Sequence, residues 1–402
     1  MQVTLLGFGG GAPEGAAVEA WDALEDAEVV IGAERLLDAI PESDEQRRFA
    51  AVRATEIVRL LEQETAERAC VVLSGDTGFY SGAGALLPLL RAHGFRCRVL
   101  PGMSSVQLMA ARLGRAWQDW TLVSAHGTAC DPVAAVMRGK CSFFLTGGES
   151  TPATICKELA DAGLGSVRVT VGENLSYSDE RMTETTAAEA AETTFAPLSV
   201  LLVEAVERRD APVSGLSDEC FARGKVPMTK QEVRAAVRSK LAVRRADTLW
   251  DVGAGTGSVS VELALTADEG RVYAVECDDE ALALIDENRR RLGAWNLRVV
   301  RGMAPTALRE LPAPDAVFIG GSKGQLRGIV ETALEKNPAA RLCMTAIALE
   351  TLSAALELCK AMDLETEITQ IAVSRGKSAG ELHLLMANNP VFLITAKRRE
   401  AP

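Results

Sequence analysis

A glycine-rich turn in the second half of the chain constrains the fold more than any other feature of the sequence. The segment LWDVGAGTGS (249–258) places Gly253, Gly255 and Gly257 between an apolar strand and a run that favours a helix. Side chains here would keep a ligand away from the backbone, and the helix start offers free N–H groups to an anion. The pattern predicts an α/β domain with a small-molecule site at the end of its first strand.

The details of this turn separate two nucleotide ligands. Dinucleotide-binding turns read GxGxxG, whereas the third glycine here comes one residue early and Asp251 precedes the turn. An acid beside helix amides suits the ammonium and carboxylate of S-adenosylmethionine, and Glu276, which ends the next strand, can accept both hydroxyls of a ribose. The sequence therefore favours S-adenosylmethionine as the cofactor, with dinucleotide binding and a purely structural turn as alternatives.

Small residues after the third strand extend this candidate site, because they allow an adenine ring to lie against the chain. Thr229 stands at capping-box spacing from Glu232 and is expected to cap a helix, while its hydroxyl also faces the cofactor. The candidate cofactor-binding residues of this domain are Thr229, Asp251, Gly253, Ala254, Gly255, Thr256, Gly257, Glu276, Gly302 and Ala304.

The whole chain follows an α/β pattern in two parts. From residue 2 to about 204, short apolar runs alternate with helical segments and predict a largely parallel sheet. The stretch 207–227 loses this periodicity and is the predicted linker. After it the pattern restarts, with strands that match a doubly wound, seven-stranded, Rossmann-like sheet. The predicted domains are therefore 1–206 and 228–402.

Composition and charge exclude several classes of partner. The formal net charge is -12 and no run of Lys or Arg offsets it, so nucleic acid is not expected. No window approaches ~18 apolar residues, and no leader is evident, so we expect no membrane partner. The nine cysteines are scattered and the three histidines lie far apart, which predicts reduced thiols and no metal site. We expect a cytoplasmic homo-oligomer.

Linked motifs in both halves make the chain recognisable. PMTKQEVR (227–234), LWDVGAGTGSVSVE (249–262), VRGMAP (300–305), FIGGSKG (318–324), ALET (348–351) and NPVFLIT (389–395) together resemble the decarboxylating C-terminal domain of the precorrin-6Y methyltransferase family. GDTGFYS (75–81), PGMSS (101–105), SAHG (124–127) and FLTGG (144–148) resemble the tetrapyrrole methylase family. The resemblance covers nearly the whole chain and implies the fused, bifunctional form, with a tetrapyrrole methylase fold of two α/β subdomains followed by a class I methyltransferase domain.

This resemblance implies methylation of carbons 5 and 15 of a precorrin macrocycle from S-adenosylmethionine, with decarboxylation of the ring C acetate, in cobalamin biosynthesis. The alternatives are another small acceptor, or a first domain that serves only in assembly. The chain departs from the family pattern in its opening loop, GFGGGAPE (7–14), which lacks the usual Asp, and at Thr345 and Ala348, where Asn and Thr are usual.

The remaining candidates are residues of the first domain and basic residues of the second. Gly75, Asp76, Ser104 and Ser105 are candidate cofactor-binding residues, with turn or helix capping as the alternative for the last three. His126 is a candidate catalytic residue, although a buried structural role is favoured. Lys323 and Arg375 are further candidate catalytic residues. A polycarboxylate acceptor requires a local basic patch, and the candidates for it are Lys323, Arg327, Arg375 and Lys377, with solvated surface charge as the alternative. We expect His93 at the surface and His383 in the core.

Overall fold

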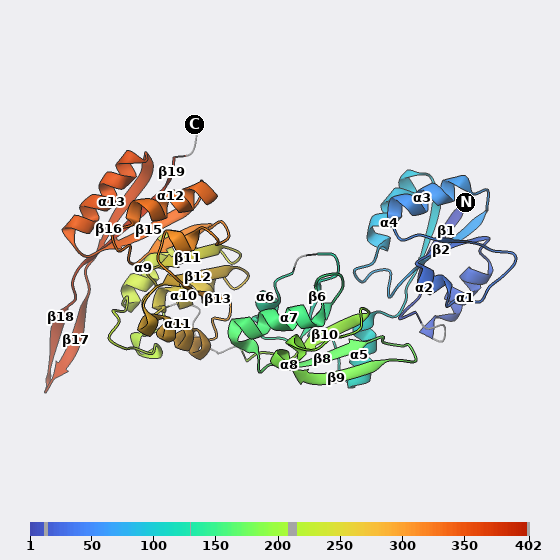
Figure 1. Cartoon of the computed structure of the whole chain (residues 1–402), viewed down its shortest axis with the longest axis horizontal. Helices are drawn as coiled ribbons and strands as arrows, with labels where there is room; N and C mark the ends of the chain where they lie inside the picture. The colour runs from blue at the N-terminus through green and yellow to red at the C-terminus, as the bar shows by residue number, and fades with distance from the viewer. Residues whose placement is uncertain (12–14, 129, 208–214, 400–402) are drawn as a thin grey trace. The chain divides into compact units, whose positions relative to one another are not determined.

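The computed structural model describes residues 1–11, 15–128, 130–207 and 215–399 (Figure 1). Contacts divide the chain into two compact units, of which the first lies within residues 1–206 and the second consists mainly of residues 207–402. Both units are mixed α/β structures, as predicted. In the part of the chain that is described, no helix is long and apolar enough to cross a membrane.

The first sheet of the first unit has five parallel strands in the order β3-β2-β4-β1-β5. Helices α3 and α4 pack on one face, and α1 and α2 on the other. Both faces are covered, as the alternation of strands and helices predicted. The elements are β1 (Gln2–Gly7), α1 (Val18–Glu25), β2 (Val29–Gly32), α2 (Glu34–Leu37), β3 (Arg47–Ala50), α3 (Ala54–Gln63), β4 (Arg68–Leu73), α4 (Ala83–Ala92) and β5 (Arg96–Leu100).

The second sheet of this unit has the order β6-β7-β10-β8-β9, and only β6 and β7 run parallel. The expectation of a largely parallel sheet is therefore wrong for this half, because the short connection from β8 to β9 allows only antiparallel pairing. The elements are α5 (Ser105–Leu113), β6 (Thr121–Ser124), α6 (Pro132–Val136), β7 (Ser142–Leu145), α7 (Pro152–Leu159), β8 (Arg168–Glu173), β9 (Arg181–Thr186), α8 (Ala187–Ala191) and β10 (Ser199–Val203).

The second unit contains the predicted seven-stranded sheet, in the order β13-β12-β11-β14-β15-β19-β16, with only β19 antiparallel to its neighbours. Helices α9, α10 and α11 pack on one face, and α12 and α13 on the other. The elements are α9 (Gln231–Leu241), β11 (Thr248–Val252), α10 (Ser258–Thr266), β12 (Arg271–Glu276), α11 (Asp279–Leu292), β13 (Leu297–Arg301), β14 (Ala316–Ile319), α12 (Leu326–Lys336), β15 (Arg341–Ala346), α13 (Leu349–Ala361), β16 (Leu364–Ile371) and β19 (Val391–Arg398).

A separate hairpin, β17 (Ser374–Ala379) and β18 (Leu382–Ala387), projects from this sheet between β16 and β19 (Figure 1). Every residue of β18 is exposed, including His383. The prediction of a core position for His383 is wrong, because the strand's apolar alternation belongs to a hairpin that no other layer of this unit covers. His93 lies at the exposed end of α4, as expected, with Nδ1 2.7 Å from Oε1 of Glu62.

The segment before α9 differs from its prediction. Residues 208–214 of the expected linker lie outside the described residues, but 215–227 packs on the second unit, with Leu216 and Phe221 in its core. Helix α9 begins at Gln231 after Lys230, and no side chain caps it. The expected Thr229 cap is therefore wrong, because the carboxylate that would complete the capping box, on Glu232, is bound to Arg375.

Gly253 shows why the turn after β11 requires glycine. Its φ angle is 71°, and a Cβ atom would lie 2.5 Å from the carbonyl oxygen of Gly321, which follows β14. The loops that follow the neighbouring strands β11 and β14 thus approach each other backbone to backbone. No side chain at Gly253 occupies this edge of the sheet, where doubly wound sheets bind ligands.

We expect Gly253→Ala to lower the free energy of unfolding by about 1–3 kcal/mol, because it adds both a clash and an unfavourable φ angle. The measurement is the urea midpoint of the full chain. Gly376→Ala is the matched control, since nothing lies within 4 Å of a Cβ atom there and the φ angle is not positive. Equal midpoints for the two variants would contradict this account.

Candidate active sites

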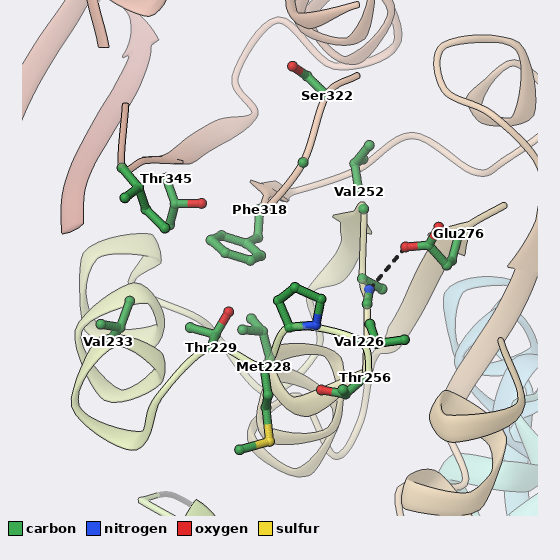
Figure 2. Close-up of a pocket in the computed structure, with 18 of the residues that line it drawn as sticks. Val226, Met228, Thr229, Val233, Val252, Thr256, Glu276, Phe318, Ser322 and Thr345 are labelled. Carbon is green, nitrogen blue, oxygen red and sulfur yellow. Dashed lines mark hydrogen bonds between the residues drawn. The ribbon is translucent and has the colours of Figure 1, made fainter. Parts of the chain in front are cut away.

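A cavity of about 630 Å³ in the second unit lies at the carboxyl ends of the parallel strands (Figure 2). Its size is typical of a small-molecule site, and this edge is where doubly wound sheets bind ligands. Most of the predicted cofactor-binding residues line it, together with Phe318 and Thr345. The predicted residues at the cavity are Thr229, Gly253, Ala254, Gly255, Thr256, Glu276, Gly302, Ala304 and Lys323.

Glu276 lies beside the glycine turn, at the end of β12. Its Oε2 accepts a hydrogen bond from the Gly255 N–H at 3.1 Å (Figure 2), and its Oε1 accepts from the N–H groups of Cys277 and Asp278 at 2.7 and 3.1 Å. Three backbone donors therefore fix the orientation of the carboxylate beside the glycine turn. A carboxylate oxygen has room for further donors, such as ligand hydroxyls.

Thr256 supplies a polar group that lacks a partner in the described protein. The residue is 1% exposed, and its Oγ1 atom is buried without a hydrogen bond. Such a group is costly unless something satisfies it. Because Thr256 lines the cavity, a bound polar ligand would provide the missing partner.

Two predicted cofactor-binding residues lie behind the cavity wall. Asp251 and Gly257 are not among its lining residues. Asp251 is completely buried, with one carboxylate oxygen bonded to Oγ of Ser260 and the other without a partner in the described structure. Burial raises the pKa of Asp251 from 3.8 to about 7; the Ser260 hydrogen bond opposes this rise and the charge of Glu276 adds to it.

Lys323 reaches the cavity from the loop after β14. Its Nζ donates to Sγ of Cys277 at 3.0 Å, and this hydrogen bond raises the pKa of Lys323. The side chain is therefore a stable cation at the cavity, as the predicted basic patch requires. Of the other basic candidates, Arg327 binds Glu331 on α12, and Lys377 lies exposed on the hairpin.

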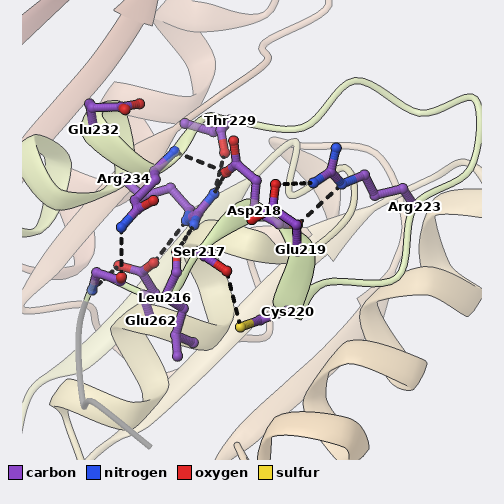
Figure 3. Close-up of polar contacts among 12 residues, drawn as sticks. Leu216, Ser217, Asp218, Glu219, Cys220, Arg223, Thr229, Glu232, Arg234 and Glu262 are labelled. Atoms are coloured by element: carbon purple, nitrogen blue, oxygen red, sulfur yellow. Dashed lines mark hydrogen bonds and ion pairs between the residues drawn. The ribbon is translucent and has the colours of Figure 1, made fainter. Parts of the chain in front are cut away.

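Arg234 of α9 forms a buried ionic cluster next to the cavity (Figure 3). The residue is 0% exposed, and it donates to Oδ1 of Asp218 at 2.7 Å and to Oε1 of Glu262 at 2.8 Å. It also donates to the carbonyl of Thr229 at 2.7 Å and lies over the Phe221 ring. The cluster therefore fixes the segment that forms one wall of the cavity.

Arg375, a predicted acceptor-binding residue, belongs to this same cluster. It donates to both carboxylate oxygens of Glu232, at 3.0 and 2.6 Å, and to Oδ2 of Asp218 at 2.9 Å. Although burial opposes ionisation, Arg234 and Arg375 together hold the pKa of Asp218 below its ordinary value. Arg375 does not line the cavity. Its charge is paired with the carboxylates of Glu232 and Asp218.

The first unit has its own cavity, of about 410 Å³, between the carboxyl ends of its strands. Three loops meet backbone to backbone beside it: a Cβ atom on Gly102 would lie 2.4 Å from the carbonyl oxygens of both Gly7 and Gly75. This close approach explains the glycines in the three motifs that follow β1, β4 and β5. Residues 12–14 of the opening loop lie outside the described residues.

The predicted residues of this unit divide between the cavity and helix or turn geometry. Gly75, Ser105 and His126 line the cavity, whereas Asp76 and Ser104 do not. Asp76 accepts from the N–H groups of two glycines in neighbouring turns, and Ser104 caps α5 in a capping box. His126 is exposed rather than buried, contrary to expectation, and its Nδ1 lies 3.2 Å from the Thr146 carbonyl.

Several cavity residues were not predicted from sequence. In the second unit they include Val226 and Pro227, which the linker assignment hid, and the apolar Met228 and Phe318. In the first unit they include Arg35, which follows β2. Its position directly after an apolar run was a usable signal, because the carboxyl ends of parallel strands share one sheet edge.

Comparison with protein families assigns each unit to a class of methyltransferase. The family described as tetrapyrrole (corrin/porphyrin) methylases matches residues 2–191, and the precorrin methyltransferase domain matches residues 219–398. The chain is thus two methyltransferase units in tandem, each with a cavity at the carboxyl ends of its strands.

Individual relatives narrow this class to one family. The precorrin-6Y C(5,15)-methyltransferase (decarboxylating) of a Sinorhizobium species is 33% identical over 83% of this chain and 81% of its own length. The probable cobalt-precorrin-6B C(15)-methyltransferase (decarboxylating) of Pyrobaculum calidifontis is 47% identical over 44% of this chain and 93% of its own. A solved precorrin-6Y C5,15-methyltransferase structure from Geobacter metallireducens, 36% identical, covers 47% of this chain and 100% of its own, with a TM-score of 0.45.

The chain belongs to the family of decarboxylating precorrin-6Y methyltransferases, because the identity to the Sinorhizobium enzyme extends over most of both chains. It is therefore an enzyme that uses S-adenosylmethionine as its methyl donor. The second cavity fits this donor. Thr256 offers a buried hydroxyl without a partner, and Glu276 offers an oriented carboxylate beside the glycine turn.

Asp251 makes stability depend on pH. Its folded-state pKa of about 7 lies above the ordinary 3.8, so its contribution is fully present below pH 3.8 and is lost as the pH rises to about 7. We expect Asp251→Asn to gain stability relative to wild type across this window, by on the order of a few kcal/mol, and to show no further gain above it.

Urea unfolding of the donor-free protein at several pH values measures this difference. Ser260→Ala should move the upper limit of the window to higher pH, because the Ser260 hydrogen bond lowers the pKa of Asp251. A stability difference between Asp251→Asn and wild type that does not change with pH would show that Asp251 ionises normally.

Proposed function

We propose that the chain methylates carbons 5 and 15 of a precorrin macrocycle and decarboxylates the acetate side chain of ring C, in cobalamin biosynthesis. The unit within residues 1–206 methylates carbon 5, and the unit of residues 228–402 carries out decarboxylation and methylation at carbon 15, with 207–227 between them. The observation that carries this proposal is the pair of separate cavities, one in each unit, within a chain of this family.

S-adenosylmethionine supplies an activated methyl group, so the residues around it have to bind and orient rather than react. In the second unit, Glu276 is placed to accept the ribose hydroxyls, and the turn Gly253–Gly257 allows close approach of the donor. Thr229 and Thr256 supply hydroxyls at the cavity. In the first unit, Gly75 and Ser105 line the corresponding space, while Asp76 and Ser104 hold the loops that form it.

The acceptor requires little more than alignment. Its reacting carbons are nucleophilic because they belong to a conjugated ring, and the same ring can hold the electrons released by decarboxylation. The apolar walls around the second cavity, which include Phe318 and Val233, exclude water from the methyl donor. Lys323 contributes a positive charge for an acceptor carboxylate.

The cavity of the first unit favours an active site over a purely structural domain. It is lined by Ser105 and His126 and is formed by loops that meet at Gly102. A domain that served only in assembly would have no need for three strand-end loops held this close together. The first unit therefore has a cavity although its opening loop lacks the Asp that is usual in the family.

Variants that impair one cavity at a time test this division in the full chain. Glu276→Gln should weaken carbon 15 methylation by roughly 10-fold or more, because it removes a charged hydrogen-bond acceptor, while carbon 5 methylation continues. Ser105→Trp, which fills the first cavity, should stop carbon 5 methylation alone. The readout is the mass of the product formed from a precorrin and labelled donor.

Wild-type protein should add two methyl groups and release one carbon dioxide. If Glu276→Gln impaired carbon 5, or Ser105→Trp impaired carbon 15, the assignment of the two units would be reversed. If Ser105→Trp changed neither methylation, the first unit would be left without a catalytic role.

We further propose that the enzyme is cytoplasmic and homo-oligomeric. The cysteines form no disulfide bond in the described residues, which suits a reducing compartment. The hairpin exposes four neighbouring apolar side chains, Leu382, Leu384, Leu385 and Met386. An exposed apolar patch of this kind is typical of a protein–protein contact. Leu385→Asp should lower the mass measured by sedimentation, whereas Val18→Asp, an exposed apolar residue of the first unit, should not. Equal masses for wild type and Leu385→Asp would exclude the hairpin as the contact.

A further inference from the structure

Arg35 is an arginine at the first cavity that has no acidic partner among the described residues. It lies in α2, directly after β2, and is exposed. Its Nη1 donates to Oη of Tyr177 and its Nη2 to Oγ of Ser74, both at 2.8 Å. Both partners are neutral, and no carboxylate in the described part of the chain forms an ion pair with it. Its full charge therefore remains available.

Other arginines of the same unit are neutralised. Arg112 pairs with Glu180, Arg115 with Glu204 and Arg181 with Glu173. These ion pairs tie surface elements together. Arg35 is different because its partners orient the guanidinium without cancelling its charge.

The walls of the first cavity make this charge distinctive. Among its described lining residues, Arg35 and His126 are the basic side chains, and no Asp or Glu is present. A guanidinium in such a setting attracts an anion, and its planar set of donors matches a carboxylate.

The triple glycine of the opening loop holds the partner of Arg35 in place. A Cβ atom on Gly11 would lie 2.0 Å from Oη of Tyr177, and one on Gly10 would lie 2.1 Å from Oγ of Ser176. The turn after β8 therefore fits against this loop only because both positions are glycine. Tyr177 is thereby fixed where it can orient Arg35.

We propose that Arg35 binds a carboxylate side chain of the macrocyclic acceptor in the first cavity, with Tyr177 and Ser74 as positioning residues. This inference rests on the proposed carbon 5 methylation. A precorrin carries several acetate and propionate groups, so a single fixed guanidinium sets which edge of the ring enters the cavity. On this proposal the charge of Arg35 serves the acceptor and not the carboxylate of the donor.

Kinetics of the full chain test this role, with carbon 5 and carbon 15 methylation followed in the same samples. Arg35→Gln should raise the KM for the acceptor in carbon 5 methylation by roughly 10- to 100-fold, because a charged hydrogen-bonding group is lost. Tyr177→Phe should give a smaller rise in KM with kcat unchanged. Carbon 15 methylation and the dissociation constant of S-adenosylmethionine, measured by calorimetry, should not change.

Arg168→Gln is the matched control, since Arg168 is an exposed arginine of the same unit that pairs with Glu184 away from the cavity. Its KM should equal that of wild type. An unchanged KM for Arg35→Gln, with carbon 5 methylation intact, would overturn this inference and leave the proposed function standing. Failure of wild-type protein to methylate carbon 5 would overturn both. Weaker donor binding in Arg35→Gln would assign Arg35 to the donor and overturn its role toward the acceptor.

Discussion

The buried guanidinium of Arg234 is the interaction on which the second cavity depends. It joins the segment before α9, through Asp218 and the Thr229 carbonyl, to Glu262 of α10, the helix that follows the glycine turn. Removing one partner of a buried ion pair costs about 3–5 kcal/mol, since the other charge stays buried. A substitution here would therefore release the cavity wall at 226–230 and disturb the helix behind the glycine turn at the same time.

The two units reach a similar outcome by different means. In the second, a buried ionic cluster and a glycine turn shape the cavity, and the carboxylate of Glu276 lies beside the turn at the end of β12. In the first, the loops after β1, β4 and β5 hold one another by direct backbone contact at Gly7, Gly75 and Gly102. Backbone contact tolerates no side chain, so both sites depend on the absence of Cβ atoms, at Gly102 in the first unit and at Gly253 in the second. The second site depends on buried charges as well.

Strand and helix periodicity, together with the glycine turn, predicted the α/β class, the seven-stranded sheet and the glycine-turn side of the second cavity, whereas most of the other residues that line this cavity were not predicted. What failed had a physical cause in each case. The second sheet is mostly antiparallel because of a short connection that the apolar runs do not reveal. The core position predicted for His383 was wrong because a solvent-exposed hairpin can show the same alternation of apolar residues as a buried strand. The cofactor-binding role of Asp251 stays a prediction, but its carboxylate is buried against Ser260 and does not line the cavity. Sequence position alone does not tell which side of a loop a carboxylate occupies.

The basic residues that are free to bind an anion also could not be predicted from sequence position alone. Their pairing indicates how an acidic protein can hold a polyanionic acceptor. The net charge of -12 repels a polycarboxylate. At physiological ionic strength, however, salt largely screens exposed charges that are more than about 8 Å apart. Within that distance, only cations without acidic partners matter. Arg375 looked suitable in the sequence, yet it is bound to Glu232 and Asp218. Arg35, in contrast, donates its described hydrogen bonds to neutral hydroxyl groups. The proposed binding of the acceptor thus depends on which cations lack an acidic partner in the fold, and this follows from tertiary pairing rather than from the number of basic residues.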